Sequence, residues 1–210
     1  MPGKSSSAST VVLATRNEAK VRELARILEG AVELVGLDTF PDAPDVAETG
    51  ATFEENALLK ARAITAHTGL PAVADDSGLC VDALNGMPGI FSARWAGGHG
   101  DDKANLDLVL AQLADVPAGR RGAHFFCAAA FVLYSGDRAA ATEHVVTGQV
   151  DGRLIRAPRG SGGFGYDPIF VPDGFDVTTA EMTAEEKDAI SHRGRAFRAL
   201  VPFITGSLTV

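Results

Sequence analysis

The stretch "VVLATRNEAKVRELARIL", residues 11–28, joins a short apolar run to a polar turn and then to a helical pattern. Val11 to Ala14 predicts a buried strand, and Glu18 to Glu29 predicts an amphipathic helix whose apolar positions recur every three or four residues. Asn17 is placed to cap that helix. This order of strand, turn and helix is the first sign of an α/β fold.

Elements of both types alternate along the rest of the chain, without internal repeats or low-complexity linkers. Thr52 and Glu55, and again Thr183 and Glu186, have the spacing of a capping box and predict two helix starts. The predicted helices cover Phe53 to His67, Asp101 to Ala114, Thr183 to Ala189 and Ser191 to Ile204. The predicted β segments are "VELVG" from Val32, "PAVADDSGLCVDAL" as strand-turn-strand, "GAHFFCAAAFVLY" and "AAATEHVVTGQVDG" turning at Ser135-Gly136-Asp137, and a short strand near Ile169 to Val171.

The two long β segments are expected in the middle of the sheet. We therefore predict an α/β fold in a single domain, residues 10–210, with a long, twisted mixed β-sheet flanked by helices. Residues 1–9 are expected to form a flexible tail.

Composition and charge exclude several classes of protein. The chain has 210 residues, of which 46% are hydrophobic and 22% charged, as in soluble globular proteins. Its net charge of -8 argues against a nucleic-acid or anionic-membrane binder, and no apolar run predicts a membrane span. Cys80 and Cys127 lack CxxC spacing, so we expect reduced, buried thiols in a cytosol.

The turn before the first helix carries polar side chains where a GxxxxGK[ST] phosphate loop carries glycines. A helix N-terminus favours a bound anion by roughly 0.3–1 kcal/mol, and Lys20 adds a point charge. Thr15, Arg16 and Asn17 lie in the same turn. The alternative is that Asn17 is only a cap and Lys20 only a solvated helix residue.

Two adjacent carboxylates, Asp75 and Asp76, lie between apolar runs in "ADDSG". Burying them is costly unless one binds a cation or accepts a proton. Neighbouring strand residues point to opposite faces, so the two are expected to do different jobs. Asp76, beside Ser77, is the candidate metal ligand and base, and Glu48 is a candidate second ligand; such oxygen donors suit Mg²⁺. The alternative is an exposed Asp-Ser-Gly turn.

The segment "GSGGFGYDP", residues 160–168, surrounds two aromatic residues with glycines. Glycine permits close approach of the backbone to a ligand, and an aromatic ring can stack on a planar base. Phe164, Tyr166 and Asp167 are therefore candidate nucleotide contacts. A tight surface loop with a packed phenylalanine explains the pattern equally well.

The segment "SHRG" places His192 and Arg193 at a helix start. Cations at a helix N-terminus are electrostatically misplaced unless an anion or a polar ligand joins them. Lys187, four residues before Ser191, can bring a third donor to the same place. An exposed basic turn is the alternative.

Six motifs in order resemble the inosine/xanthosine triphosphate pyrophosphatase family. They are "ATRNEAKVREL", "ETGATFEENALLKARA", "ADDSGLCVDAL", "PGIFSARWAG", "GGFGYDPIF" and "MTAEEKDAISHRG". The resemblance covers nearly all of residues 11–205, and Trp95 replaces the tyrosine expected in "SARY".

The resemblance implies a cytoplasmic, homodimeric, Mg²⁺-dependent hydrolase that binds its nucleotide in a central cleft. Such an enzyme cleaves ITP, dITP and XTP to the monophosphate and pyrophosphate, removing deaminated purines. The implied contacts to the triphosphate are Thr15, Arg16, Asn17, Glu18, Ala19 and Lys20, with Lys60 and Ser77 beside the phosphates. The implied nucleotide contacts are Phe164, Gly165, Tyr166, Asp167, Lys187, His192 and Arg193; the metal ligands are Glu48 and Asp76; the catalytic residues are Asp76 and Lys20.

Two other functions stay open at this point. A related pyrophosphatase of pyrimidine triphosphates would prefer a one-ring base. A nucleotide sensor would bind in the same pocket without turnover, although paired carboxylates near a triphosphate make sense mainly with a metal ion between them. A Walker-type ATPase is disfavoured, because no GxxxxGK[ST] motif is present.

Overall fold

The computed structural model describes residues 10–28, 30, 32–135 and 140–208. The predicted tail, residues 1–9, and most of the predicted turn at Ser135-Gly136-Asp137 lie outside this range. Within it, six strands form one sheet in the order β2-β1-β3-β4-β5-β6. The strands are β1 (Thr10–Leu13), β2 (Glu33–Gly36), β3 (Ala72–Val81), β4 (Gly122–Ser135), β5 (Ala140–Leu154) and β6 (Phe170–Pro172).

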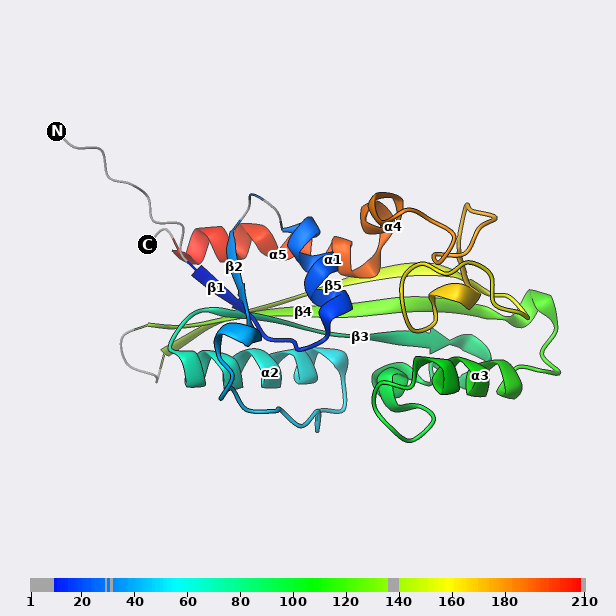
Figure 1. Ribbon diagram of the computed structural model, residues 1–210, viewed down its shortest axis with the longest axis horizontal. Helices are drawn as coiled ribbons and strands as arrows, with labels where there is room; N and C mark the ends of the chain where they lie inside the picture. The colour runs from blue at the N-terminus through cyan, green and yellow to red at the C-terminus, as the bar shows by residue number, and fades with distance from the viewer. Residues whose placement is uncertain (1–9, 29, 31, 136–139, 209–210) are drawn as a thin grey trace.

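The sheet is mixed, as predicted. β1 pairs in parallel with β2 and β3, whereas β3, β4, β5 and β6 pair antiparallel in sequence. Figure 1 shows β3, β4 and β5 extended along the long axis of the molecule, with the short parallel strands at one end. The two longest strands, β4 and β5, lie in the interior of the sheet, where the sequence places them.

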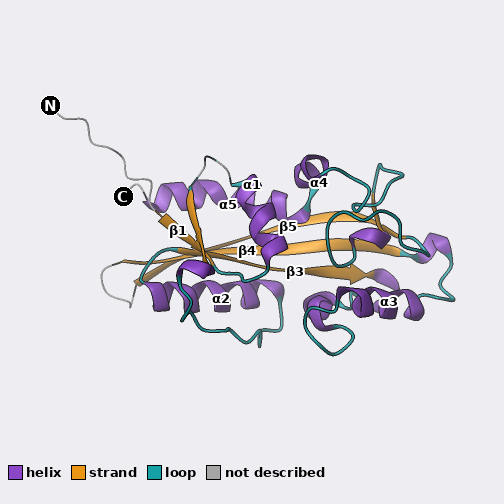
Figure 2. Cartoon of the chain, in the orientation of Figure 1, coloured by secondary structure: helices purple, strands orange, loops and turns teal. Residues whose placement is uncertain are grey.

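Helices cover both faces of the sheet (Figure 2). They are α1 (Glu18–Ile27), α2 (Phe53–Thr68), α3 (Asp102–Gln112), α4 (Ala184–Ile190) and α5 (His192–Leu208), and each matches a predicted helix to within a few residues. In Figure 1, α2 and α3 lie on one side of the long strands, and α1, α4 and α5 lie on the other.

Small residues in the middle of β4 let helices approach both faces of the sheet. Ala128 and Ala130 belong to the apolar cluster that contains α2, whereas Ala129 belongs to the cluster that contains α1 and α5. All three are fully buried. Because strand side chains alternate between faces, a continuous alanine run suits a strand covered on both sides.

The predicted helix caps are present. The side chain of Asn17 accepts from Lys20 N, and that of Thr52 accepts from Glu55 N. Thr183 and Glu186 form a complete capping box. These caps fix the starts of α1, α2 and α4 next to the segments that carry the candidate site residues.

One prediction of local structure is wrong. The segment "PAVADDSGLCVDAL" contains no turn: β3 runs unbroken through Asp75, Asp76, Ser77 and Gly78 and pairs with β4 over its whole length. The alternative of an exposed Asp-Ser-Gly turn is wrong for the same reason, since both carboxylates are buried. Charge and a glycine indicated a turn, but tertiary pairing with the long β4 holds the segment extended.

Two further expectations concern cysteines and membranes. Cys80 and Cys127 are both free and buried, as predicted. Burial raises the pKa of the Cys127 thiol to about 12, so it is an inert core residue. Across the described part of the chain, every helix is too short or too polar to span a membrane.

Candidate active site

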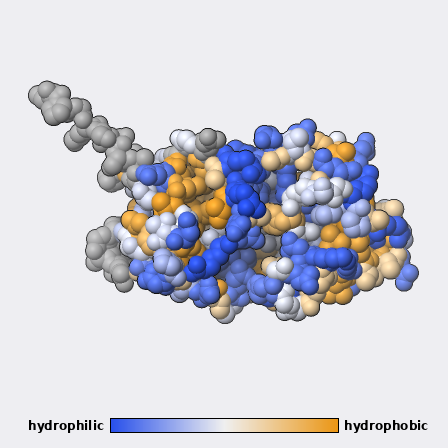
Figure 3. All heavy atoms as spheres, viewed as in Figure 1, coloured by the Kyte–Doolittle hydropathy of each residue, from blue (hydrophilic) through white to orange (hydrophobic). Residues whose placement is uncertain are grey.

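A cavity of about 420 Å³ opens where the parallel part of the sheet ends. β1 pairs with β3 only at Ala72 and Val73, and the chain then turns into α1. The edge of β3 is therefore uncovered by β1 from Asp75 onward, and side chains from both of its faces reach the gap. Figure 3 shows a hydrophilic band that runs down this face of the molecule from the position of α1, between more hydrophobic areas.

The cavity collects most of the predicted site residues. Those lining it are Thr15, Arg16, Asn17, Lys20, Glu48, Lys60, Asp76, Ser77, Phe164, Gly165, Tyr166, Asp167, Lys187, His192 and Arg193. Glu18 and Ala19 do not line it. Glu18 is exposed on the first turn of α1 and pairs with Arg22 at 3.3 Å.

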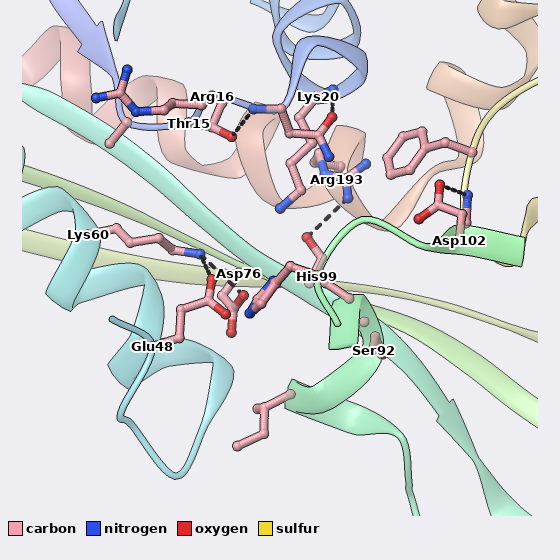
Figure 4. A pocket seen from close by; sticks show the side chains of 18 of the residues that line it. Thr15, Arg16, Lys20, Glu48, Lys60, Asp76, Ser92, His99, Asp102 and Arg193 are labelled. Atoms are coloured by element: carbon pink, nitrogen blue, oxygen red, sulfur yellow. Dashed lines mark hydrogen bonds and ion pairs between the residues drawn. The ribbon is translucent and has the colours of Figure 1, made fainter. Parts of the chain in front are cut away.

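The segment that enters α1 brings one cation, Lys20, into the cavity and directs another, Arg16, to its rim. The ammonium of Lys20 lies 2.9 Å from the Asp75 carboxylate. Arg16 instead donates to the carbonyl oxygen of Ala43 and pairs with the exposed Asp45. Figure 4 shows Lys20 pointing into the cavity between Arg193 and the Asp76 region.

Asp75 belongs to a buried network of ion pairs. Its carboxylate accepts from Lys20 Nζ, from Arg193 Nε at 3.1 Å and from the Ser77 hydroxyl. Arg193 Nη1 also donates to Glu23 at 2.6 Å. Burial favours the neutral form of Asp75, but Lys20 and Arg193 outweigh it and hold the pKa of this carboxyl below its ordinary value.

Asp76 belongs to a second cluster, on the α2 side of the strand. Lys60 Nζ lies 3.2 Å from its carboxylate and 2.7 Å from that of Glu48. Arg94 Nη1 donates to the other oxygen of Glu48 at 2.9 Å, and Asn56 donates to Asp76 at 3.1 Å. Figure 4 shows Lys60, Glu48 and Asp76 converging. The prediction that the two aspartates do different jobs fits this division.

The two neighbouring aspartates differ in basicity. Burial and the nearby Glu48 raise the pKa of Asp76 despite the opposing charge of Lys60, whereas the pKa of Asp75 is lowered. When the pKa values of two neighbouring groups are shifted in opposite directions, the group with the raised pKa suits a proton acceptor and the other suits a fixed charge. Asp76 is therefore the better base of the two.

The donors around Lys60 are of the kind that Mg²⁺ prefers. Glu48 and Asp76 place two carboxylates around one ammonium, and the charge of Glu48 raises the pKa of Asp76. A divalent cation offsets that effect, and Mg²⁺ typically takes one or two carboxylates plus waters and phosphate oxygens. No group of three or more His, Cys, Asp or Glu side chains that could hold a metal ion occurs among the described residues. Two carboxylates are a donor set that suits Mg²⁺ whose other ligands are waters and phosphate oxygens.

The glycine-rich loop, residues 160–168, is organised by Asp167. The carboxylate of this residue accepts from Phe164 N at 2.8 Å, from Lys187 Nζ at 2.6 Å and from the Thr179 hydroxyl at 2.8 Å. The left-handed Gly163, at φ 70°, approaches Asp167 so closely that an added Cβ would lie 2.1 Å from its Oδ2. Asp167 thus holds the loop and the ammonium of Lys187 together.

Phe164 lies between two cations at the other end of the cavity. The ammonium of Lys187 is 5.1 Å from its ring centroid, and the guanidinium carbon of Arg193 is 5.4 Å away. Nearby, the ring of His192 stacks on Phe125 at 4.9 Å, with 12° between the planes. This end of the cavity is therefore aromatic and flanked by cations, which suits a planar base with polar edges.

Buried carboxylates of the protein itself balance the positive charge at the "SHRG" start of α5. Arg193 is paired with Glu23 and Asp75. Burial, and then the charges of Arg193 and Lys187, hold the pKa of His192 well below its ordinary value of 6.5, so its imidazole is neutral at pH 7. The basic turn is therefore not an exposed one, since His192 and Arg193 are 6% and 3% exposed.

Acid is expected to destabilise the fold through His192. The unfolded chain takes up this proton near pH 6.5 and the folded chain does not, so the free energy of unfolding falls as the pH drops below 6.5. The slope is at most about 1.4 kcal/mol per pH unit for one group. The free energy of unfolding is measured by denaturant titration at several pH values for the protein and for His192→Phe, which keeps a ring against Phe125. Below pH 6.5 the difference between the two free energies should change with pH. A difference that stays constant would contradict the prediction.

The sequence did not single out Glu23, Asn56, Arg94 or His99. Asn56 had a usable signal, because it lies three residues after Phe53 and four before Lys60, on the inward face of α2. Arg94 and His99 come from the segment between β3 and α3, and Figure 4 shows His99 projecting toward the Asp76 cluster. Nothing in the helical period of α1 distinguishes the buried Glu23 from its exposed charged neighbours.

Comparisons with known proteins identify the family. Residues 11–203 match the Ham1 family. The chain is 64% identical to the dITP/XTP pyrophosphatase of Streptomyces coelicolor and 61% identical to that of Streptomyces avermitilis, each over 92% of this chain and 96% of the relative.

Solved structures give the same result. A nucleoside-triphosphatase described as a dITP/XTP pyrophosphatase from Mycobacterium abscessus is 57% identical, with a TM-score of 0.73 over 92% of this chain and 99% of that one. A HAM1 protein from Coxiella burnetii is 40% identical, with a TM-score of 0.82 over 94% of this chain and 99% of that one. These matches confirm the resemblance inferred from the six motifs. The chain therefore belongs to the Ham1 family.

Proposed function

We propose that this protein hydrolyses dITP, ITP and XTP to the nucleoside monophosphate and pyrophosphate, and so removes deaminated purines from the nucleotide pool. The observation that carries the proposal is the cavity in which Asp76 pairs with Lys60 and which Lys20 and Arg193 also line. The similarity to dITP/XTP pyrophosphatases supports the choice of substrate.

The triphosphate is assigned to the end of the cavity formed by α1 and α2. The N-terminal amides of α1 and the ammonium of Lys20 favour a bound anion. Lys60 adds a second charge from α2, and Thr15 and Ser77 add hydroxyls. Side chains at a junction between strand and helix thus replace the glycine cradle of a phosphate loop.

The reaction we propose is in-line attack by water on the α-phosphorus. The bond from the water oxygen to phosphorus forms, the bond from phosphorus to the bridging oxygen breaks, and pyrophosphate leaves. Asp76 accepts the proton of the water as the general base. Lys20 and Lys60 offset negative charge on the phosphate oxygens.

Magnesium is part of the proposal. Glu48 and Asp76 are the residues that would hold it, and the bound ion would supply charge neutralisation at the phosphate oxygens. The support is the donor set: two carboxylates that converge on Lys60, of which Glu48 raises the pKa of Asp76.

Base selection is assigned to the end of the cavity formed by Phe164, His192 and Arg193. Hypoxanthine and xanthine carry a carbonyl acceptor at the 6-position, whereas adenine carries an amino donor. Arg193 uses three of its five N–H groups in bonds to other described residues, and the remaining two are the donors we assign to a ligand. A site with buried donors rejects a base that leaves them unpaired, by up to roughly 10⁴-fold. Guanine shares the 6-carbonyl, so its exclusion has to involve the 2-position.

The test is a panel of substrates. Purified protein with Mg²⁺ is incubated separately with dITP, ITP, XTP, ATP, GTP and dTTP, and the products are identified by chromatography. We expect the first three to give monophosphate and pyrophosphate at rates at least about 100-fold above those of the others. Nucleoside diphosphate and phosphate would place the attack at the γ-phosphorus and contradict the mechanism. A preference for dTTP would favour the pyrimidine enzyme, and binding of ITP without turnover would favour the sensor.

Assembly and location complete the proposal. We infer a cytoplasmic homodimer whose pyrophosphatase domain covers residues 10–210. The extent of the domain is supported by the continuous sheet and by the family match over residues 11–203. The free, buried cysteines and the negative net charge suit a cytosolic protein that binds no nucleic acid. The dimer rests on the family resemblance.

A further inference from the structure

A buried asparagine joins the two segments that carry the candidate metal ligands. Asn56, in the first turn of α2, has no exposed surface. Its Nδ2 donates to Asp76 Oδ2 at 3.1 Å, and its Oδ1 accepts from Gly50 N at 2.8 Å. Gly50 belongs to the segment that leads from Glu48 into α2. One carboxamide thus links the Glu48 segment to the strand that bears Asp76.

The orientation of this carboxamide is fixed by its partners. Gly50 N–H can only donate, and an ionised Asp76 can only accept, so the carbonyl faces the first and the amino group faces the second. Serine, threonine and aspartate cannot satisfy both partners with the same reach and charge. Thr52 already caps α2, so Asn56 is not required as the helix cap.

The approach of the backbone to Asn56 is unusually close. An added Cβ at Gly50 would lie 2.8 Å from Asn56 Oδ1 and 2.7 Å from the Cβ of Glu55. Only glycine fits there, so the segment is packed directly onto the carboxamide. If the side chain at position 56 only filled space, an apolar residue would serve, because a buried polar group that loses its partner costs about 1–3 kcal/mol.

We propose that Asn56 is a positioning residue: it holds the carboxylate of Asp76 in one orientation and fixes the segment bearing Glu48 at the same time. The ring of contacts runs from Asn56 to Asp76, from Asp76 through Lys60 to Glu48, and back along the chain to Gly50. This inference rests on the proposed function, in which Asp76 and Glu48 do the chemistry. Asn56 itself acts only through them.

Two substitutions separate the two hydrogen bonds. Asn56→Ala removes both, whereas Asn56→Asp keeps the acceptor for Gly50 and replaces the donor to Asp76 by an acceptor of nearly the same shape. The control is Thr65→Val, on the same helix. Thr65 is 1% exposed, donates to the carbonyl of Val132 at 3.2 Å and lies outside the cavity lining, nine residues after Asn56.

The first readout is the exchange rate of the Gly50 amide hydrogen, measured by NMR without metal or substrate. We expect exchange to accelerate about 10-fold in Asn56→Ala and to stay within about twofold of the unmodified protein in Asn56→Asp and Thr65→Val. The second readout is Mn²⁺ binding to the substrate-free protein, measured by electron paramagnetic resonance. We expect the dissociation constant to rise about 10-fold in Asn56→Ala.

The third readout is turnover of dITP. Both Asn56 variants should lose about 10- to 100-fold in kcat with KM changed by less than about threefold, and Thr65→Val should lose neither. Normal kcat in Asn56→Asp would show that the donor to Asp76 is not needed, and would overturn the proposal. So would unchanged Gly50 exchange in Asn56→Ala. If the unmodified protein fails to cleave dITP, the proposed function falls, while the exchange and Mn²⁺ measurements still decide whether Asn56 positions these residues.

Discussion

Replacing Asp76 by asparagine is expected to lower kcat for dITP by roughly 10³-fold while the protein stays folded. Asparagine keeps the shape of the side chain and can still accept from Asn56 Nδ2, which lies 3.1 Å away in the unmodified protein. It cannot take a proton from water, and it is a weaker oxygen donor to a cation. The proposed base and one of the proposed metal ligands are therefore lost together.

The same substitution should not reduce stability. The fold raises the pKa of Asp76, so the ionised carboxylate is less favourable in the folded chain than in the unfolded chain. At pH 7 the folded protein therefore carries a charge that favours unfolding, and asparagine removes it. Lys60 loses the carboxylate that most raises its pKa, but it retains its 2.7 Å contact with Glu48. We expect the Tm of Asp76→Asn to stay close to that of the unmodified protein, because relief from burying the Asp76 charge offsets the weaker pairing of Lys60.

Release of pyrophosphate from dITP and a thermal unfolding curve test both expectations. Asp107→Asn is the matched control, because Asp107 is exposed on α3 and pairs only with Lys103 at the surface among the contacts described. It should change neither kcat nor Tm appreciably. An Asp76→Asn protein that keeps near-normal kcat would remove Asp76 from the mechanism, and a large loss of Tm would show that the residue is mainly structural.

Local patterns predicted most of this fold because the helices and strands are long and because cap residues mark where the helices begin. The helix caps at Asn17, Thr52 and Thr183 mark helix starts that the structure keeps. The prediction failed in "ADDSG", where Asp75 and Asp76 suggested a turn. The pairing with β4, whose partner residues run from Phe126 to Ala130, holds that segment extended. Such a contact has no local signature.

The candidate site was predicted less completely than the fold. Motifs from separate parts of the chain supplied the residues that line the cavity, but they could not say which residues contact one another. The opposite pKa shifts of Asp75 and Asp76 depend on Lys20 and Arg193 on one side and Glu48 on the other. Those three neighbours come from α1, from α5 and from the segment before α2, so the opposite shifts follow only from the tertiary structure.

The largest loss of stability is expected from Arg193→Met. Arg193 is 3% exposed and lies between Glu23 at 2.6 Å and Asp75 at 3.1 Å. Removing its charge leaves two buried carboxylates, of which only Asp75 keeps a cation, Lys20. One oxygen of each, Glu23 Oε1 and Asp75 Oδ1, already lacks a hydrogen-bond partner among the described residues. Breaking a buried pair in this way typically costs about 3–5 kcal/mol of unfolding free energy.

Denaturant unfolding of four proteins separates the buried network from an ordinary ion pair. Arg62→Met is the control: Arg62 also contacts a carboxylate through two nitrogens, at 2.7 and 2.6 Å to Glu143, but its side chain is 46% exposed. Its loss should cost less than about 1 kcal/mol. Adding Glu23→Gln to Arg193→Met should recover at least about 1 kcal/mol, because it removes the carboxylate left without a cation. Equal losses for Arg193→Met and Arg62→Met, or no recovery in the double variant, would mean that the charges at Arg193 do not stabilise the fold and that its burial serves the ligand alone.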